Sequence, residues 1–178
     1  GATATEETSY ELATLKREIN LIADADQVQY NLATMPGVTV PAVTNHLLDM
    51  VEDRADSMAI IDIEKVYTAD SESSATAQAR NAFTIKQSVD TLKARNINTS
   101  YGATYSPWVL IQDTISNRSL WAPPSVAALG ALSHTDRTAA PWYAPARFAR
   151  GGLSEGAAGI PVLDVSRRLS SDERDSLY

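Results

Sequence analysis

The feature that most constrains the fold is a mostly apolar run at residues 57–63, Ser-Met-Ala-Ile-Ile-Asp-Ile. A run of this kind is typical of a strand in a sheet that is covered on both faces, as parallel sheets are. An alternating stretch at residues 28–32 precedes it, an extended segment at residues 102–112 follows it, and helical patterns separate the three. This order predicts a partly parallel sheet with right-handed crossovers.

Capping residues and prolines mark the helix starts. Thr8 with Glu11 forms a capping box that predicts a helix near residues 8–22, and Ser170 with Glu173 forms a second one that opens the last helix. Pro41 suits the first turn of another helix. The remaining pattern predicts a helix at 71–95, a turn at 116–117 after which 120–121 pair back, a helix of small apolar residues opened by 123–125, an irregular loop at 139–160 and a strand at 162–165.

The 178 residues fit one domain, residues 1–178, with the long loop at 139–160 inside it. The chain ends about two turns into a capped helix, so we expect it to be a fragment of a longer protein. It contains no cysteine, which excludes disulfides, thiolate metal sites and cysteine nucleophiles.

The net charge of −7 is unevenly distributed. Residues 1–100 hold 15 acidic and 8 basic residues, whereas residues 101–178 hold seven of each, and those seven basic residues are all arginine. Arginine pairs bidentately with carboxylates and is enriched in protein interfaces. Because no basic face is evident, nucleic acid is not an expected partner. No run of 18 apolar residues occurs, so no membrane contact is expected.

The sequence offers little support for catalysis or metal binding. His134 has Ser133 and Asp136 nearby, but the members of a catalytic triad converge from separate elements. The paired carboxylates lack the ligand spacing of a calcium loop, although Asp62 and Glu64 stand at a strand end, where parallel sheets often place sites. We therefore predict no catalytic residue, no metal site and no enzyme activity.

A phosphate-binding turn is also absent from the sequence pattern. Such a turn needs glycines between a strand and a helix, so that backbone amides can approach the anion. Residues 35–38 and 64–67 do not fit, and the glycines at 151–156 have no GxGxxG pattern and no strand directly before them. We predict the α/β class: a partly parallel mixed sheet flanked by helices, with Rossmann-like layering but no nucleotide site and no cofactor.

An ordered series of aromatic, proline and small residues runs through the second half of the chain. It comprises Tyr-x-Pro-Trp at 105–108, Pro-Pro-Ser at 123–125, Thr-Asp at 135–136 and Trp-x-Ala-Pro-Ala at 142–146, and upstream Pro-Gly-Val at 36–38 and Arg-x-Asp at 54–56. Over about residues 10–178 the chain resembles the core of tail sheath proteins from contractile bacteriophages and related injection machines. The residues that carry this resemblance are Tyr105, Pro107, Trp108, Pro123, Pro124, Ser125, Thr135, Asp136, Trp142, Ala144 and Pro145.

The chain departs from the family pattern at three positions. His134 stands where the family usually has arginine, and Pro141 and Arg147 stand where it commonly has glycine. The outer insertion domains and the C-terminal linking portion of the family are expected to lie outside residues 1–178. In the family, the chain termini link neighbouring subunits by strand exchange.

The resemblance implies a structural role in a virion tail that assembles in the host cytoplasm. Sheath subunits form rings, hexameric in this family, which stack around a tail tube and repack on contraction to drive the tube into a cell. The implied partners are further copies of the chain, the tail tube protein, and baseplate and tail terminator proteins.

The motif is expected to be mainly structural, with Trp108, Trp121 and Trp142 burying large areas. The expected subunit contacts are Arg137, Arg147 and Arg150. Two alternatives remain open: a Rossmann-like nucleotide-binding enzyme, and a non-contractile virion or baseplate protein.

Overall fold

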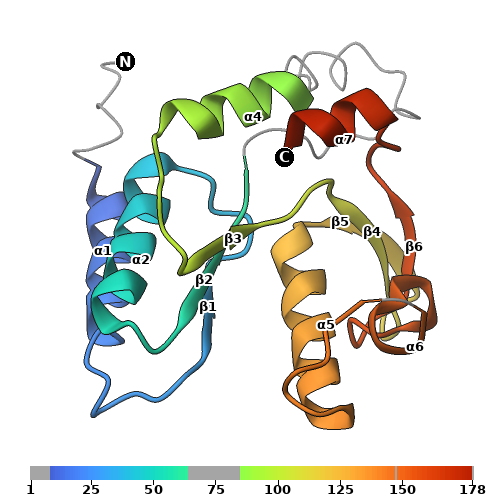
Figure 1. Ribbon diagram of the computed structural model, residues 1–178, viewed down its shortest axis with the longest axis horizontal. Helices are drawn as coiled ribbons and strands as arrows, with labels where there is room; N and C mark the ends of the chain where they lie inside the picture. The colour runs from blue at the N-terminus through green and yellow to red at the C-terminus, as the bar shows by residue number, and fades with distance from the viewer. Residues whose placement is uncertain (1–8, 64–84, 147, 178) are drawn as a thin grey trace. The chain divides into compact units, whose positions relative to one another are not determined.

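The computed structural model describes residues 9–63, 85–146 and 148–177 (Figure 1). The chain divides into two compact units. Unit 1 comprises Gly1–Asp62 and Asn98–Thr104, and unit 2 comprises Ile63–Ile97 and Tyr105–Tyr178. The structure confirms the α/β class, with a parallel sheet in unit 1, an antiparallel sheet in unit 2 and helices beside both.

Unit 1 is built on a three-stranded parallel sheet in the order β1-β2-β3. Its strands are β1 (Leu32–Thr34), β2 (Met58–Ile61) and β3 (Gly102–Thr104). The central strand β2 buries Ala59, Ile60 and Ile61, because it is paired on both edges and packed against α2. The apolar run at 57–63 is therefore the centre of the unit 1 sheet, as its composition predicts.

Two helices pack side by side in unit 1, α1 (Tyr10–Leu21) and α2 (Pro41–Arg54) (Figure 1). Ser9 caps α1, since its hydroxyl accepts the Leu12 amide at 3.2 Å. The predicted cap Thr8 lies outside the described residues. Pro41 occupies the start of α2, where its missing N–H leaves no bond unmade.

Arg54, the last residue of α2, ties together four segments of unit 1. Its guanidinium donates to the carbonyls of Ile22 at 2.6 Å and Val28 at 3.0 Å, and makes a two-bonded ion pair with Asp56. It also lies 4.1 Å from the centre of the Tyr30 ring. The left-handed backbone of Ala55, with φ of 57°, ends the helix and lets the two charged side chains meet.

The expected strand at residues 28–32 is wrong in its boundaries. The first strand begins only at Leu32, and Val28 and Tyr30 precede it. The physical reason is Arg54, whose guanidinium donates to the Val28 carbonyl and stacks on the Tyr30 ring. This stretch therefore binds the Arg54 side chain and does not pair with a neighbouring strand.

Unit 2 contains an antiparallel sheet in the order β5-β4-β6. The strands are β4 (Val109–Asp113), β5 (Arg118–Ala122) and β6 (Val162–Val165). The predicted return after the 116–117 turn is confirmed, with Leu120 opposite Ile111 and Trp121 opposite Leu110. The predicted strand at 162–165 is also confirmed.

Residues 102–112 do not form the single extended segment that we expected. Their first part is β3 of unit 1, and their second part is β4 of unit 2. Ser106–Pro107, a cis peptide bond, lies between them. Proline has no N–H to donate to a strand ladder, so Pro107 marks the point where one sheet ends and the next begins.

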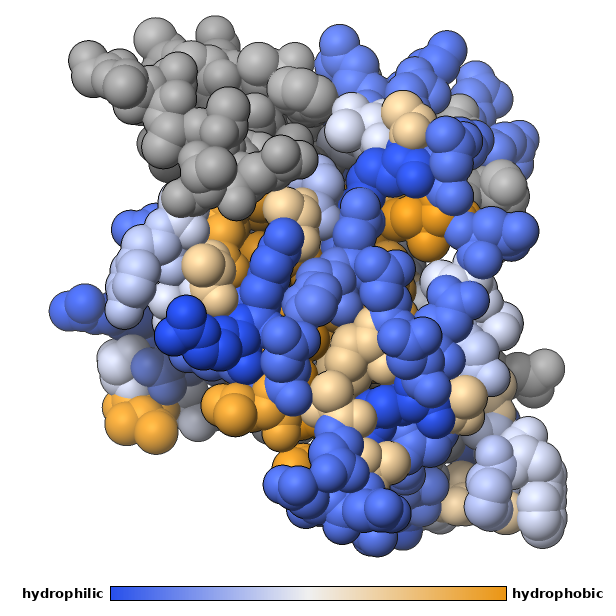
Figure 2. All heavy atoms as spheres, turned by 90° about the vertical axis from the view of Figure 1, so that its left-hand side faces the viewer, coloured by the Kyte–Doolittle hydropathy of each residue, from blue (hydrophilic) through white to orange (hydrophobic). Residues whose placement is uncertain are grey.

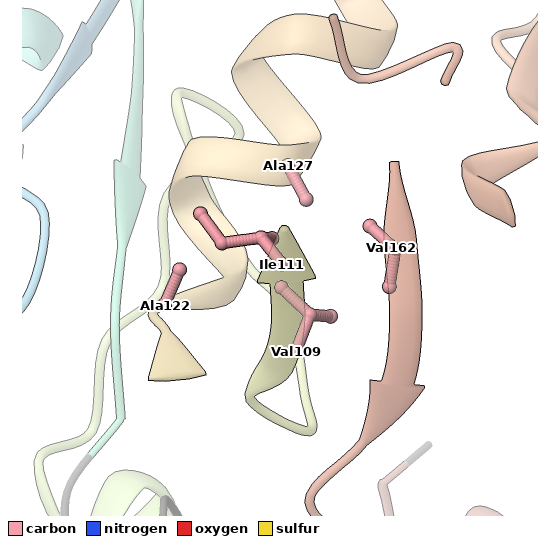
Figure 3. Packing of buried hydrophobic residues seen from close by; sticks show 5 residues of the cluster. All are labelled: Val109, Ile111, Ala122, Ala127 and Val162. Atoms are coloured by element: carbon pink, nitrogen blue, oxygen red, sulfur yellow. The ribbon is translucent and has the colours of Figure 1, made fainter. Parts of the chain in front are cut away.

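Helix α5 (Pro124–Thr138) covers one face of the antiparallel sheet. Figure 3 shows Ala127 of this helix facing the side chains of β4 and β6. The buried cluster that joins them consists of Val109, Ile111, Ala122, Ala127 and Val162. Small residues on the helix permit this close approach, as the composition of residues 126–132 predicts, although the helix runs on to Thr138.

Among its described residues, unit 2 has three further helices: α4 (Ile85–Ala94), α6 (Phe148–Gly151) and α7 (Ser171–Leu177). Only the last part of the predicted 71–95 helix lies within the described residues, and there Val89 is buried. Within the predicted loop 139–160 the chain forms α6 and a 3-10 turn at Leu153–Glu155.

The second capping box is confirmed. The Ser170 amide donates to the Glu173 carboxylate at 3.0 Å, and the Glu173 amide donates to the Ser170 hydroxyl at 3.2 Å. The Ser170 amide, helped by Arg167, holds the pKa of Glu173 below its usual range.

The Arg54–Asp56 pair predicts how unit 1 responds to acid. The bonds from Arg54 lower the pKa of Asp56, so on acidification the unfolded chain takes up this proton before the folded chain does. Stability is therefore expected to be complete above the usual carboxyl pKa of about 3.9 and to decline as the pH falls below it. Urea denaturation followed from neutral to acid pH measures this.

Replacing Asp56 by Asn should lower stability at neutral pH and flatten the acid decline. Asp53→Asn is the matched control, because Asp53 is an exposed acid on α2, the helix that carries Arg54. Identical pH profiles for Asp56→Asn and the unchanged protein would contradict the role given to this pair.

Candidate functional site

Four of the motif residues of the second half line one pocket in unit 2. Its volume is about 240 Å³, and its wall is contributed by the segments on both sides of the cis-proline, by α5, by residues near α6 and by β6. Four motif residues line it, one or more from each of three separate segments: Tyr105, Pro107, Pro124 and Pro145. The remaining lining residues are Ser106, Val109, Ala127, Ala128, Ala131, Leu132, Gly151, Leu153 and Val165.

Two glycines allow the walls of this pocket to close together. A Cβ placed on Gly130 of α5 would lie 2.1 Å from the carbonyl oxygen of Ala158, and one placed on Gly151 would lie 2.7 Å from that of Pro145. Both obstacles are backbone atoms, which cannot rotate away. Glycine is therefore required at position 130 by the packing of Ala158 against α5, and at position 151 by the packing of α6 against Pro145.

Thr135 of α5 forms a hydrogen bond with α6, the segment that carries Arg150. This buried side chain donates toward the Ala131 carbonyl at 3.0 Å and the Arg150 carbonyl at 3.2 Å. The Arg150 guanidinium in turn lies 4.5 Å from the centre of the Tyr143 ring, a cation–π contact. Motif residue Thr135 thus positions the backbone of an expected contact residue.

The other motif residues divide into buried and exposed ones. Pro124 and Ser125 are buried at the start of α5, and Trp108 is half-buried, with its carbonyl accepting the Ser166 amide at 2.7 Å. Pro123 immediately precedes that helix as its capping residue. Asp136 and Ala144 are exposed, as is Arg137, whereas Arg147 lies outside the described residues.

The expectation that Trp142 buries a large area is wrong. Its side chain is 81% exposed, and the neighbouring Tyr143 is 47% exposed. Both stand in the stretch between α5 and α6. The expectation of large buried areas for the other two tryptophans holds in part, since Trp108 and Trp121 are half-buried.

Asp62, which directly follows β2 in unit 1, has a structural role. Asp62, which is 1% exposed, accepts the Gly37 amide at 2.9 Å. Gly37 belongs to the turn after β1, where a phosphate would need free backbone amides. The Asp62 carboxylate already accepts the hydrogen bond of the Gly37 amide, so this turn is poorly suited to binding an anion.

The pocket offers shape and few reactive groups. Tyr105 is the one titratable residue in its wall. Among residues 9–63, 85–146 and 148–177 no group of three or more His, Asp or Glu side chains could hold a metal ion. Within the same described ranges, no helix has the length and apolar character needed to cross a membrane.

Sequence reasoning missed two features of this site. It did not foresee that Tyr105, Pro107, Pro124 and Pro145 line a common pocket, because convergence depends on the path of the chain between them. It gave Gly130 no role, although a glycine inside a helix of small residues is itself a signal of close packing.

No protein-family model matches the chain, and no curated protein sequence is significantly similar to it.

Gly130 gives a direct test of this packing. Gly130→Ala is expected to lower the free energy of unfolding of unit 2 by about 1–3 kcal/mol, because the new methyl group meets the Ala158 carbonyl and the loop must move. Ser133→Ala, at an exposed position of the same helix, should change it by less than about 0.5 kcal/mol. Equal stabilities of the two variants, measured by urea denaturation, would refute the close contact.

Proposed function

We propose that this chain is a structural subunit of a contractile tail sheath. Copies of it assemble as stacked rings around a tail tube and repack on contraction to drive the tube into a host cell. The observation that carries the proposal is the convergence of four family-motif residues, from three separate segments, on one pocket. Residues that only chance had placed in family order would have no reason to meet in space.

The chemistry of the motif supports a structural role over a catalytic one. Prolines, alanines and an aromatic ring give the pocket its shape, and two glycines allow backbone carbonyls to pack closely beside it. Close packing suits a sheath subunit, because contraction is a switch between two packings of nearly rigid bodies. Each subunit contributes a small free-energy difference, and an array adds them together.

The proposal also assigns partners and a location. The chain would contact its own copies, in rings that are hexameric in the family, and also the tail tube, baseplate and tail terminator proteins. It would belong to the virion tail after assembly in the host cytoplasm.

Electron microscopy of the purified protein tests the proposal. Tubes or stacked rings are the expected result at high protein concentration. A parallel thermal-shift series with nucleotides and dinucleotides examines the enzyme alternative, since a ligand that binds the native state raises its melting temperature. Monomers whose melting temperature rises with a nucleotide would overturn the sheath proposal.

Two arginines of unit 2, Arg137 and Arg150, are expected to take part in assembly. The double variant Arg137→Glu/Arg150→Glu should greatly reduce tube formation, because two cations that face carboxylates of another copy become anions. Arg118→Glu is a control at an exposed arginine of β5. Circular dichroism should show that all three proteins are folded; normal tubes from the double variant would exclude these arginines as contacts.

A further inference from the structure

The pocket of unit 2 is sized for a protein side chain. Its volume of about 240 Å³ falls below the roughly 300–1,000 Å³ of sites for drug-sized ligands. Most of its lining is apolar, and it lies within the unit that also carries the exposed Trp142 and Tyr143. Tryptophan, tyrosine and arginine are the residues that most often dominate binding energy at interfaces.

A cation stands next to this apolar wall. Arg150 directly precedes Gly151 of the pocket lining, and its guanidinium is held over the Tyr143 ring. Its buried Nε–H has no acceptor among the residues that the structure describes. A guanidinium held in place by an aromatic ring loses little freedom when it binds a carboxylate. The surface therefore fits an apolar side chain that has carboxylates beside it.

Unit 1 presents such a group at the end of α1. Leu21 is 72% exposed, and Glu18, Asp24 and Asp26 around it in sequence are exposed as well. Glu18 lies three residues before Leu21 on the helix, so the two share a face. Figure 2 shows the side of the molecule that carries α1, where hydrophilic side chains cover most of the surface.

Net charge disfavours one of the ways in which two copies can meet. Unit 1 holds eleven acidic and three basic residues, a net charge of −8, whereas unit 2 holds eleven acidic and twelve basic residues, a net charge of +1. Two copies that met through unit 1 would bring like charges together, which is unfavourable. Contact between unit 1 of one copy and unit 2 of the next avoids this repulsion.

We propose that the pocket of unit 2 receives Leu21 of a second copy, with Arg150 pairing to the carboxylates beside that leucine. The contact joins two different surfaces, so it repeats head to tail, and such contacts generate rings or helical filaments. The inference rests on the proposed function and goes further, because it names the two surfaces that meet.

The absence of native cysteines makes cross-linking a clean test. The full chain is prepared as Leu21→Cys and, with a different affinity tag, as Ala128→Cys, whose position lies in the pocket wall. The two proteins are mixed and treated with a short bis-maleimide. A heterodimer should form in several-fold excess over controls, and less of it at high salt, because salt screens the charge pairing. A chain carrying both cysteines should give a ladder of oligomers.

Two control pairs use exposed positions close to the chosen ones: Arg17→Cys with Ala128→Cys, and Leu21→Cys with Ser133→Cys. Yields equal to these controls would overturn the docking proposal. Tubes in the microscope without the 21–128 cross-link would leave the sheath function standing and refute this contact. A ladder without tubes or rings would do the reverse, and monomers without cross-links would refute both.

Discussion

The architecture of unit 1 depends on one guanidinium. Arg54 binds carbonyls at the end of α1 and in the following loop, stacks on Tyr30, and pairs with Asp56 just before β2. Its side chain is 3% exposed, so these bonds replace water around a charge that could not otherwise be buried. A lysine would supply one point charge in place of this planar set of donors. The path from α1 into the sheet is therefore fixed by a side chain at the end of α2.

In unit 2 the corresponding constraint is the small cross-section of α5. Alanines on its inner face and Gly130 allow both the sheet and the 156–159 turn to approach closely. The same alanines leave room beside Tyr105 and Pro107, which becomes the pocket. Close packing on one part of the helix and an open cavity on another thus have a common origin in residue size.

Local sequence patterns correctly predicted those elements that are determined by interactions between residues close together in the chain. The apolar run at 57–63, the proline at the start of α2 and the Ser170–Glu173 box each became the element that its own residues favour. Failures occurred where a distant partner decided the outcome. Val28 and Tyr30 alternate with polar residues as in a strand, but both contact Arg54, which lies 24 or more residues away in sequence. Trp142 has a large apolar side chain of the kind that often lies in a core, but it stands in a loop where it is exposed.

The proposed site follows the same division. A sequence motif could name Tyr105, Pro107, Pro124 and Pro145 but could not show that they share a cavity. Nor could it connect that cavity with Leu21, which belongs to no motif. An interface between copies needs complementarity between surfaces that lie far apart in one chain, so neither half is recognisable alone. The units differ in net charge, −8 against +1. This property of such an interface can be counted from the sequence once the units are known, because net charge requires no knowledge of contacts. It favours unlike units meeting, and repetition of that contact is what builds a ring or a tube.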